Sequence, residues 1–404
     1  MSVRKRTWVS GGEERSAWIV DYFDQEGVRR QETFARKKEA DARWIEVGHE
    51  IREGTHTARG ASITMEEAAE LWIEAARLAD LERSTLRQCR GHIDHHIVPL
   101  IGRAKLADLS TPRIQRFADD LLTRPKADGS DETLSRSTAR KVLSSLKSLI
   151  KHAQRQGQIA KNPAQPVGIR VPTRGTVKLK AGRDFPDKRE INSILQAASG
   201  RWRPLIITAV FTGLRASELR GLRWEDVDLD GKLIHVHQRA DHWGTMGAPK
   251  SEAGERTIPM TPMVANMLKE WRLACPRRDR GKKGADDPGV LGLVFPNGLG
   301  KVESHANFCN RGWYPMQIEI GLTEDTGKKD AEGRPVLRPK YGFHTLRHFF
   351  ASWLLAEGFS LKKAQGMLGH ATMAMTADTY GHLLPDLEND AAKMAASQLA
   401  LVAR

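Results

Sequence analysis

The chain is poor in cysteine and has no long hydrophobic run. Three cysteines, Cys89, Cys275 and Cys309, are too few and too scattered for a disulfide framework or a thiolate metal site. The longest apolar stretch, Pro204–Phe211, is far shorter than the roughly 20 residues that a membrane-spanning helix needs. The basic start, Met1–Arg6, runs straight into Gly and Glu and leaves no room for an apolar signal core. We therefore expect a cytoplasmic protein with reduced thiols and no membrane partner.

Negative charge is also in short supply. The 404 residues carry 64 Lys and Arg against 50 Asp and Glu, a formal net charge of +14. Hydrophobic residues make up 40% of the chain, which excludes global disorder, because enough apolar surface exists to offset the entropy of ordering. A surplus of Lys and Arg favours a polyanionic partner, since bases that neutralise phosphates release counterions and gain affinity. Nucleic acid is the first expectation.

The missing acids are concentrated in one segment. Thr133–Arg183, 51 residues long, contains no Asp or Glu, although the average composition would place about six there. Its first half, Ser137–Gln156, has helical apolar spacing, and its second half is a Pro-rich stretch that predicts an extended basic linker at 166–183. A face without acids is typical of a phosphate-tracking surface. The bases expected to contact DNA are Arg136, Arg140, Lys141, Lys147, Arg170, Arg174, Lys178 and Lys180.

Periodicity predicts a mainly α fold with small β elements, an α+β protein of three domains: 1–60, 63–165 and 184–404. The first is expected to hold strands Ala17–Asp21 and Gln31–Phe34 around a turn at Asp24–Gly27, then a helix at Lys37–Glu53. The second is expected to hold helices Thr64–Ala76, Ser84–Ile97 with Ser84 as N-cap, Pro112–Leu122 and Ser137–Gln156.

The third domain is expected to be mostly helical with one hairpin. Its predicted helices are Trp202–Gly213, Ala216–Leu222, Pro262–Leu273, Ala306–Ile318, Thr345–Glu357, Ser360–Leu368 and Thr372–His382. Strands Lys232–His237 and Arg256–Met260 are expected to frame a Gly-rich hairpin. Two polar stretches, Arg277–Pro288 and Thr323–Lys340, are predicted to be surface loops.

Two polar segments of this domain stand out early in its sequence. Arg215, in Thr-Gly-Leu-Arg-Ala-Ser-Glu-Leu, falls at a helix junction with Glu218 one turn later. In isolation such a pair is most simply a surface ion pair at i,i+3, but a carboxylate can also hold a cation pointing into a cleft. Lys250 lies in the hairpin, where a lysine is usually solvated, although one near a phosphate can donate a proton.

Two more segments follow near the end of the chain. His344 and Arg347, in His-Thr-Leu-Arg-His, share one face at a helix start, and both donate hydrogen bonds to anions. His370 ends Leu-Gly-His, and Tyr380 follows ten residues later. Taken singly, each is explained by capping or by core packing.

Together, the segments fit the cleavage of a phosphodiester without a metal. Two guanidiniums and two imidazoles around one phosphate would neutralise the charge that builds on its nonbridging oxygens. A tyrosine nucleophile conserves the bond energy in a covalent phosphoester, and a lysine protonates the leaving oxygen. Among only four tyrosines, Tyr380 is the one that follows these segments closely.

The order of these motifs resembles the catalytic signature of tyrosine recombinases, the phage integrase family, over residues 63–390. The resemblance implies that Arg215 and Arg347 clamp the phosphate, that His344 assists proton transfer and that His370 binds a phosphate oxygen. Lys250 would protonate the 5′ oxygen, Tyr380 would form the 3′-phosphotyrosine, and Glu218 would support Arg215. It further implies catalysis without metal, cofactor or ATP, and a homotetramer on double-stranded DNA attachment sites, with accessory DNA-bending or directionality factors as further partners. Residues 1–60 resemble the arm-type DNA-binding module of larger integrases.

An integrase that inserts or excises a phage or mobile element is the function we expect first. A tyrosine recombinase for resolution or transposition shares every catalytic residue and stays open as an alternative. A non-catalytic DNA-binding regulator is the alternative from another class. A metal-dependent nuclease is disfavoured, because no carboxylate cluster accompanies the signature segments.

Overall fold

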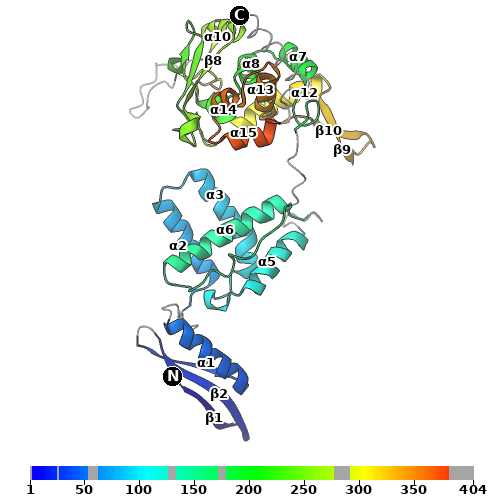
Figure 1. Ribbon diagram of the computed structural model, residues 1–404. Helices are drawn as coiled ribbons and strands as arrows, with labels where there is room; N and C mark the ends of the chain where they lie inside the picture. Colours follow the sequence, from blue (N-terminus) through cyan, green and yellow to red (C-terminus); the bar gives the residue numbers. More distant parts are fainter. Residues whose placement is uncertain are drawn as a thin grey trace, which may run out of the picture. The chain divides into compact units, whose positions relative to one another are not determined.

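A computed structural model describes residues 2–24, 27–52, 62–125, 133–171, 179–276 and 292–381. The chain divides into two compact units, Met1–Thr173 and Arg174–Arg404. Helices dominate both, and the strands of the described residues form four small sheets, which confirms the expected α+β class (Figure 1). Within those residues, no helix is both long and apolar enough to span a membrane.

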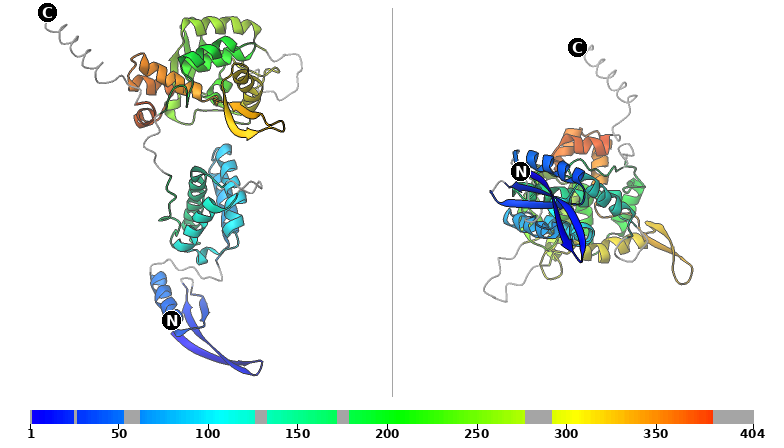
Figure 2. Two further views of the ribbon diagram at one scale, coloured as in Figure 1. Left: turned by 90° about the vertical axis from the view of Figure 1, so that its right-hand side faces the viewer. Right: turned by 90° about the horizontal axis from the view of Figure 1, so that it is seen from below.

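The N-terminal module is a three-stranded antiparallel sheet with one helix against it. Its elements are β1 (Ser2–Ser10), β2 (Glu13–Phe23), β3 (Arg29–Phe34) and α1 (Lys37–Arg52). The β2 strand and α1 bury Val20, Tyr22, Ala40 and Val47 between them. Figure 2 shows the long ribbon that β1 and β2 form beside α1.

Strand β1 was not expected from the sequence, because nearly all its residues are exposed and its polar pattern carries no alternation. It forms through pairing with β2, in register from Ser2 opposite Asp21 to Ser10 opposite Glu13. The connecting Gly11 and Gly12 have φ of 66° and 82°, the left-handed geometry of a tight two-residue hairpin.

The helical domain that follows has its own core. Its helices are α2 (Met65–Leu78), α3 (Arg83–His92), a π-helical turn (Ile93–Ile97), α4 (Val98–Ile101), α5 (Thr111–Thr123) and α6 (Arg136–Arg155). Thr64 and Glu67 form a capping box at the start of α2. The prediction of Ser84 as an N-cap was wrong. Glu82 is the N-cap of α3, and the Ser84 hydroxyl donates to the Glu82 carboxylate at 2.9 Å instead.

The expected linker at 166–183 is only partly extended. Val167 and Ile169 are 3% and 8% exposed and pack in the core of the helical domain. The Lys147 ammonium donates to the Gln165 carbonyl at 3.1 Å, which ties this segment to α6. Apolar residues at alternate positions thus anchor the first part of the segment, and residues 172–178 lie outside the described ranges.

The C-terminal unit mixes helices with a small sheet. Its helices are α7 (Lys188–Ala197), α8 (Trp202–Thr212), α9 (Ala216–Gly221), α10 (Pro262–Ala274), α11 (His305–Phe308), α12 (Tyr314–Glu319), α13 (Thr345–Ala356), α14 (Leu361–Leu368) and α15 (Met373–Tyr380). Its strands are β4 (Val227–Asp228), β5 (Leu233–Val236), β6 (Arg239–Ala240), β7 (Met246–Gly247) and β8 (Arg256–Pro259). The sheet order is β4-β5-β8, and β6 and β7 form the hairpin expected between β5 and β8.

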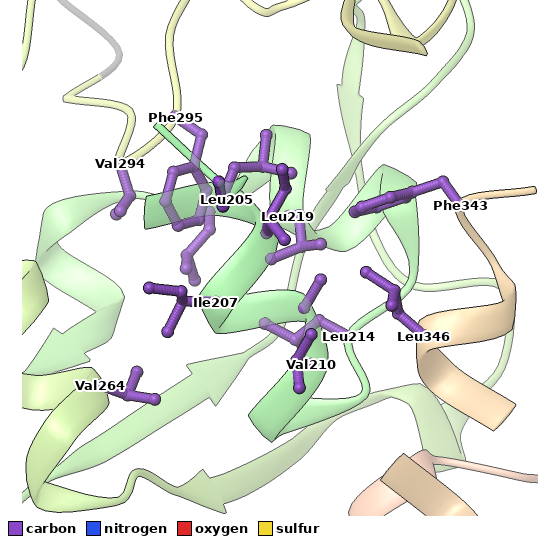
Figure 3. Packing of buried hydrophobic residues seen from close by; sticks show 14 of the residues in the cluster. Leu205, Ile207, Val210, Leu214, Leu219, Val264, Val294, Phe295, Phe343 and Leu346 are labelled. Carbon is purple, nitrogen blue, oxygen red and sulfur yellow. The ribbon is translucent and has the colours of Figure 1, made fainter. Parts of the chain in front are cut away.

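The larger hydrophobic core of this unit surrounds α8, whose apolar residues are buried on nearly all sides. A smaller cluster lies between α13, α14 and α15. Figure 3 shows Leu205, Ile207 and Val210 of α8 packed with residues that come from distant parts of the sequence, Phe343 and Leu346 among them. Helix α7 was not expected. It is short, and only Ile191 and Ile194 of it are buried.

The prediction of a loop at Thr323–Lys340 was wrong. The segment is an antiparallel hairpin of β9 (Thr323–Lys329) and β10 (Pro335–Pro339), which projects from the unit in both views of Figure 2. Its turn is stabilised by Asp330, whose Oδ1 accepts from the backbone N–H of Glu332 and Arg334. Strand β9 is almost entirely polar, and the adjacent apolar residues Val336 and Leu337 of the short β10 are both exposed, so the sequence has no alternation of apolar and polar residues to reveal the strands. The other expected loop, Arg277–Pro288, lies outside the described residues.

Candidate active site

The corner between α8 and α9 positions the first predicted cation. Gly213 ends α8 with φ of 60°, and a Cβ at this position would lie 2.3 Å from the Phe350 ring. Only glycine fits such a corner without strain. The chain then turns so that Arg215 becomes the N-cap of α9. The Arg215 side chain is 34% exposed, so it can meet a ligand.

Glu218 holds Arg215 from one turn further along α9. It is 3% exposed, and its carboxylate accepts the Arg215 backbone N–H and side-chain Nη1, both at 2.8 Å. Burial acts to raise the pKa of Glu218, but the hydrogen bonds and charge of Arg256, followed by those of Arg215, hold it below its usual value. Arg256 was not among the expected site residues. It lies far from Glu218 in the sequence, so no sequence pattern linked the two residues.

Arg347 is the second cation of the cluster. It lies on the first turn of α13, only 3% exposed, and donates through Nη1 to the Gly213 carbonyl at 2.8 Å and through Nη2 to the Leu368 carbonyl. Desolvation, followed by the charge of Arg215, lowers its pKa to about 9. The two carbonyl partners come from the α8 corner and the end of α14, so Arg347 joins three elements at one point.

His370 follows the left-handed Gly369 that ends α14. Its Nδ1 is 2.9 Å from the Thr376 hydroxyl, and the Gly369 carbonyl accepts from Arg215 Nη2 at 3.0 Å. Desolvation, followed by the charges of Arg347 and Arg215, lowers the pKa of His370 to about 4. The imidazole is therefore neutral near pH 7 in the free protein. Thr376, fully buried on α15, was not expected to take part.

Tyr380 ends α15 and is buried, at 2% exposure, among apolar residues of α13 and α14. Its hydroxyl lies 2.5 Å from His348 Nδ1. Desolvation raises the pKa of Tyr380 to about 12 against the opposing charge of Arg347, so the phenol is un-ionised and its hydroxyl donates. His348 was not singled out in the sequence, although its place one turn after His344 was a usable signal.

His344 and Lys250 lie toward the outside of the site. His344 is the N-cap of α13, and its ring meets that of His348 edge to face at a centroid distance of 5.1 Å. Desolvation, followed by His348 and Arg347, lowers the pKa of His344 to about 4. Lys250 is exposed on the bend after β7, two residues before the turn Glu252–Gly254. Its approach to the cluster remains a prediction.

The Lys and Arg residues expected to contact DNA differ in exposure. Arg136, Arg140 and Lys141 are exposed along α6, whereas Lys147 is half-buried. Arg170 and, in the C-terminal unit, Lys180 are exposed. Arg174 and Lys178 lie outside the described residues.

The cluster is suited to stabilising the doubly negative transition state that forms when a phosphodiester is attacked. The Arg215 and Arg347 side chains each donate two of their five N–H groups to the protein contacts described above, which leaves donors on both guanidiniums for oxygens of a ligand. Two neutral imidazoles and a phenol complete the set. In the described part of the chain, no three His, Cys, Asp or Glu side chains are grouped as metal ligands would be.

Comparisons with known proteins agree with this chemistry. The family model described as "Phage integrase family" matches residues 185–386, and that of the phage integrase N-terminal SAM-like domain matches 64–122. A tyrosine recombinase XerC-like protein from Caldanaerobacter subterraneus subsp. tengcongensis is 27% identical, covering 96% of this chain and 97% of its own. The prophage integrase IntR of Escherichia coli is 24% identical, covering 96% and 98%.

Solved structures share the fold. The Tn1549 transposon integrase in complex with transposon right end DNA superposes with a TM-score of 0.58 at 20% identity, covering 84% of this chain and all of that one. A lambda integrase dimer bound to a COC′ core site gives 0.53 at 18%, covering 92% and 93%. The chain belongs to the phage integrase family. It is an enzyme, a tyrosine-type site-specific DNA recombinase.

Proposed function

We propose that the protein cleaves and rejoins double-stranded DNA through a 3′-phosphotyrosyl intermediate on Tyr380. The single observation that supports this most strongly is the convergence of Arg215, Arg347, His370 and Tyr380 from four separate elements. Arg215 and Arg347 both donate to carbonyls of the short segment Leu368–His370, and His370 in turn contacts Thr376 of α15, the helix that carries Tyr380.

The chemistry needs no energy source. The Tyr380 hydroxyl passes its proton to His348 Nδ1, which lies 2.5 Å away, and its oxygen attacks the phosphorus. A P–O bond to tyrosine thereby replaces the P–O bond to the 5′ oxygen. Lys250 protonates the departing 5′ oxygen, while Arg215 and Arg347 neutralise the nonbridging oxygens and His370 donates to one of them. His344 assists proton transfer. A 5′-hydroxyl from another strand then reverses the step, and because one phosphoester replaces another, rejoining requires no ATP.

Integration or excision of a mobile element is the biological role we propose. A prophage integrase is among the relatives that align with 96% of the chain, which supports this role. We propose that residues 1–60 bind arm-type DNA, that 63–165 and 184–404 clamp the core site, and that 166–183 connects them along the basic segment. A lambda integrase has been observed as a tetramer bound to a Holliday junction, and we propose the same assembly here.

The N-terminal sheet has a face suited to DNA. Arg4, Arg6 and Trp8 alternate along β1 and pair with Ile19, Ala17 and Arg15 of β2. Because alternate residues share a face, the three point away from the residues that pack on α1. A basic ribbon of this width can enter a major groove.

Covalent trapping tests the proposed activity. On a core-site substrate nicked near the crossover, the wild type should become covalently attached to DNA in EDTA without nucleotide. Tyr380→Phe should abolish the adduct and leave DNA binding intact, whereas Arg215→Ala or Arg347→Ala should slow it by orders of magnitude, because one missing donor costs about 3 kcal/mol at such a site. DNA binding by the wild type without any adduct would instead identify a non-catalytic regulator.

A further inference from the structure

Arg256 is a buried cation that none of the proposed catalytic roles uses. It opens β8, and its side chain is 5% exposed. Its Nη1 and Nη2 donate to the two carboxylate oxygens of Glu218 at 3.1 and 2.8 Å, and Nη1 also donates to the Gly254 carbonyl at 2.9 Å. Its Nε donates to the Met367 carbonyl at 2.7 Å. Four of its five N–H groups are thus occupied, so Arg256 does not bind DNA itself.

Glu218 is shared between two guanidiniums. Each of its oxygens accepts one bond from Arg215 and one from Arg256, which fills the four acceptor positions of a carboxylate. If Glu218 faced Arg215 alone, its full negative charge would compete with a phosphate for the Arg215 donors. Because Arg256 donates to both oxygens of the carboxylate, it neutralises part of the negative charge of Glu218. More of the positive charge of Arg215 is then available to a ligand.

The same side chain also fixes the segment that carries His370. The Met367 carbonyl that Arg256 holds directly precedes the two carbonyls, of Leu368 and Gly369, that accept from Arg347 and Arg215. The contact is close, since a Cβ on Gly369 would lie 2.9 Å from Arg256 Nη1. Arg256 therefore connects the end of α14 to α9 and to the Gly254 turn that follows Lys250.

We propose that Arg256 is a positioning residue for strand cleavage, which neutralises Glu218 so that Arg215 stays available to the scissile phosphate and which holds the Met367–His370 segment in place. This inference rests on the proposed function, because it assigns Arg256 a role through Arg215 and His370.

A charge-pair experiment separates this role from simple structural support. Single-turnover adduct formation at saturating DNA should fall by about 30-fold or more in Arg256→Met, because the uncompensated Glu218 then captures Arg215. Removing that charge as well, in Glu218→Gln with Arg256→Met, should recover about 5-fold or more relative to Arg256→Met, since no carboxylate then competes for Arg215. A double variant no faster than the single one would overturn the neutralising role.

A modified substrate gives a second readout that loss of structure does not mimic. Replacing one nonbridging oxygen of the scissile phosphate by methyl removes its negative charge and with it the need for a full Arg215 charge. On this substrate, the defect of Arg256→Met should shrink to about 3-fold or less. An undiminished defect would mean that Arg256 does not act through the phosphate clamp.

Controls keep the outcomes distinct. Arg338→Met removes an exposed arginine from an ion pair with Glu324 in the same unit and should cleave like the wild type. Thermal unfolding and DNA affinity are measured for each variant. If Arg256→Met does not fold, the substrate with the methyl-substituted phosphate and the ordinary substrate are compared in Arg256→Lys. Lysine keeps a positive charge near Glu218 but cannot donate to both carboxylate oxygens as the guanidinium does. A wild type that forms no adduct defeats the proposed function, whereas a wild type that reacts beside an equally fast Arg256→Met defeats only this inference.

Discussion

At the scale of single residues, the most unusual feature is a phenol buried against an imidazole. The Tyr380 hydroxyl donates to His348 Nδ1 inside an apolar cluster, and no water reaches most of the ring. A buried hydroxyl without an acceptor loses its hydration and gains nothing in return. The partner histidine therefore contributes to stability as well as to the placement of the proposed nucleophile.

Loss of this hydrogen bond should be visible in unfolding experiments. His348→Leu should lower the free energy of unfolding by about 1–3 kcal/mol, because it leaves the Tyr380 hydroxyl buried without a hydrogen-bond partner. In the Tyr380→Phe background, the same substitution should cost less, since no hydroxyl remains to be satisfied. Urea unfolding of the four proteins measures the coupling, and strictly additive costs would show that the hydrogen bond does not form in solution.

Stability should also depend on pH through His370. Its pKa of about 4 in the folded protein lies below the ordinary value of 6.5, so the unfolded chain binds more protons between these values. The stabilisation is fully present above pH 6.5 and is lost as the pH falls toward 4, by about 1–2 kcal/mol after allowance for partial exposure. His370→Asn should flatten this dependence, measured by urea unfolding at pH 7.5 and 4.5.

The residues that the sequence did not reveal share one property. Arg256, His348 and Thr376 act through contacts with partners on other elements, and only His348, one turn after His344, stands in a sequence pattern that could have revealed it. Arg215 and Arg347 were predictable because they belong to compact motifs with characteristic neighbours. Motifs thus revealed the residues expected to touch the substrate, but not the residues that hold them.

At the scale of elements, helix ends place the site. Gly213 and Gly369 close α8 and α14 in the left-handed conformation, and both carbonyls accept from the clamp arginines. Most helices were predictable from their apolar period, as in α5 and α6. The strands β1, β9 and β10 were not, because their residues are mostly exposed, no apolar and polar residues alternate along them, and the pairing itself stabilises them.

Substitution at the α8 corner should show how little freedom it has. Gly213→Ala should destabilise the protein by about 2 kcal/mol or more, because φ is positive and the new methyl group meets Phe350. It should also slow cleavage, since the Gly213 carbonyl orients Arg347. Gly366→Ala, inside α14 with nothing within 4 Å of the added Cβ, should be neutral or stabilising. Equal effects of both, in thermal unfolding, would contradict the steric argument.

At the scale of the whole molecule, charge is distributed unevenly between the parts of the chain. The acid-free segment supplies an exposed basic face on α6, while the catalytic cluster balances its cations with the buried Glu218. The composition allowed the basic face of α6 to be predicted as a DNA surface. It carried no information on the charge balance around Glu218, because burial and pairing depend on the fold.

The basic face should govern the salt dependence of binding. Arg140→Ala with Lys141→Ala should reduce the slope of log affinity against log salt by about two units, one for each lost phosphate contact. Arg174→Ala with Lys178→Ala should act in the same way if the linker follows the DNA. Arg77→Ala, exposed on α2 and paired with Glu74, is the matched control and should leave the slope unchanged. Filter binding over a range of potassium concentrations measures the slopes, and an unaltered slope would remove α6 from the interface.

The short helix α15 carries two functions on one buried face. Thr376 and Tyr380, one turn apart, bind His370 and His348 respectively. Displacement of α15 from its packed position would remove the proposed nucleophile Tyr380 from His348 and release His370 from Thr376 at the same time. A subunit with α15 displaced would still bind DNA through its basic face but could not cleave it, so we expect strand cleavage to depend on the packing of these eight residues.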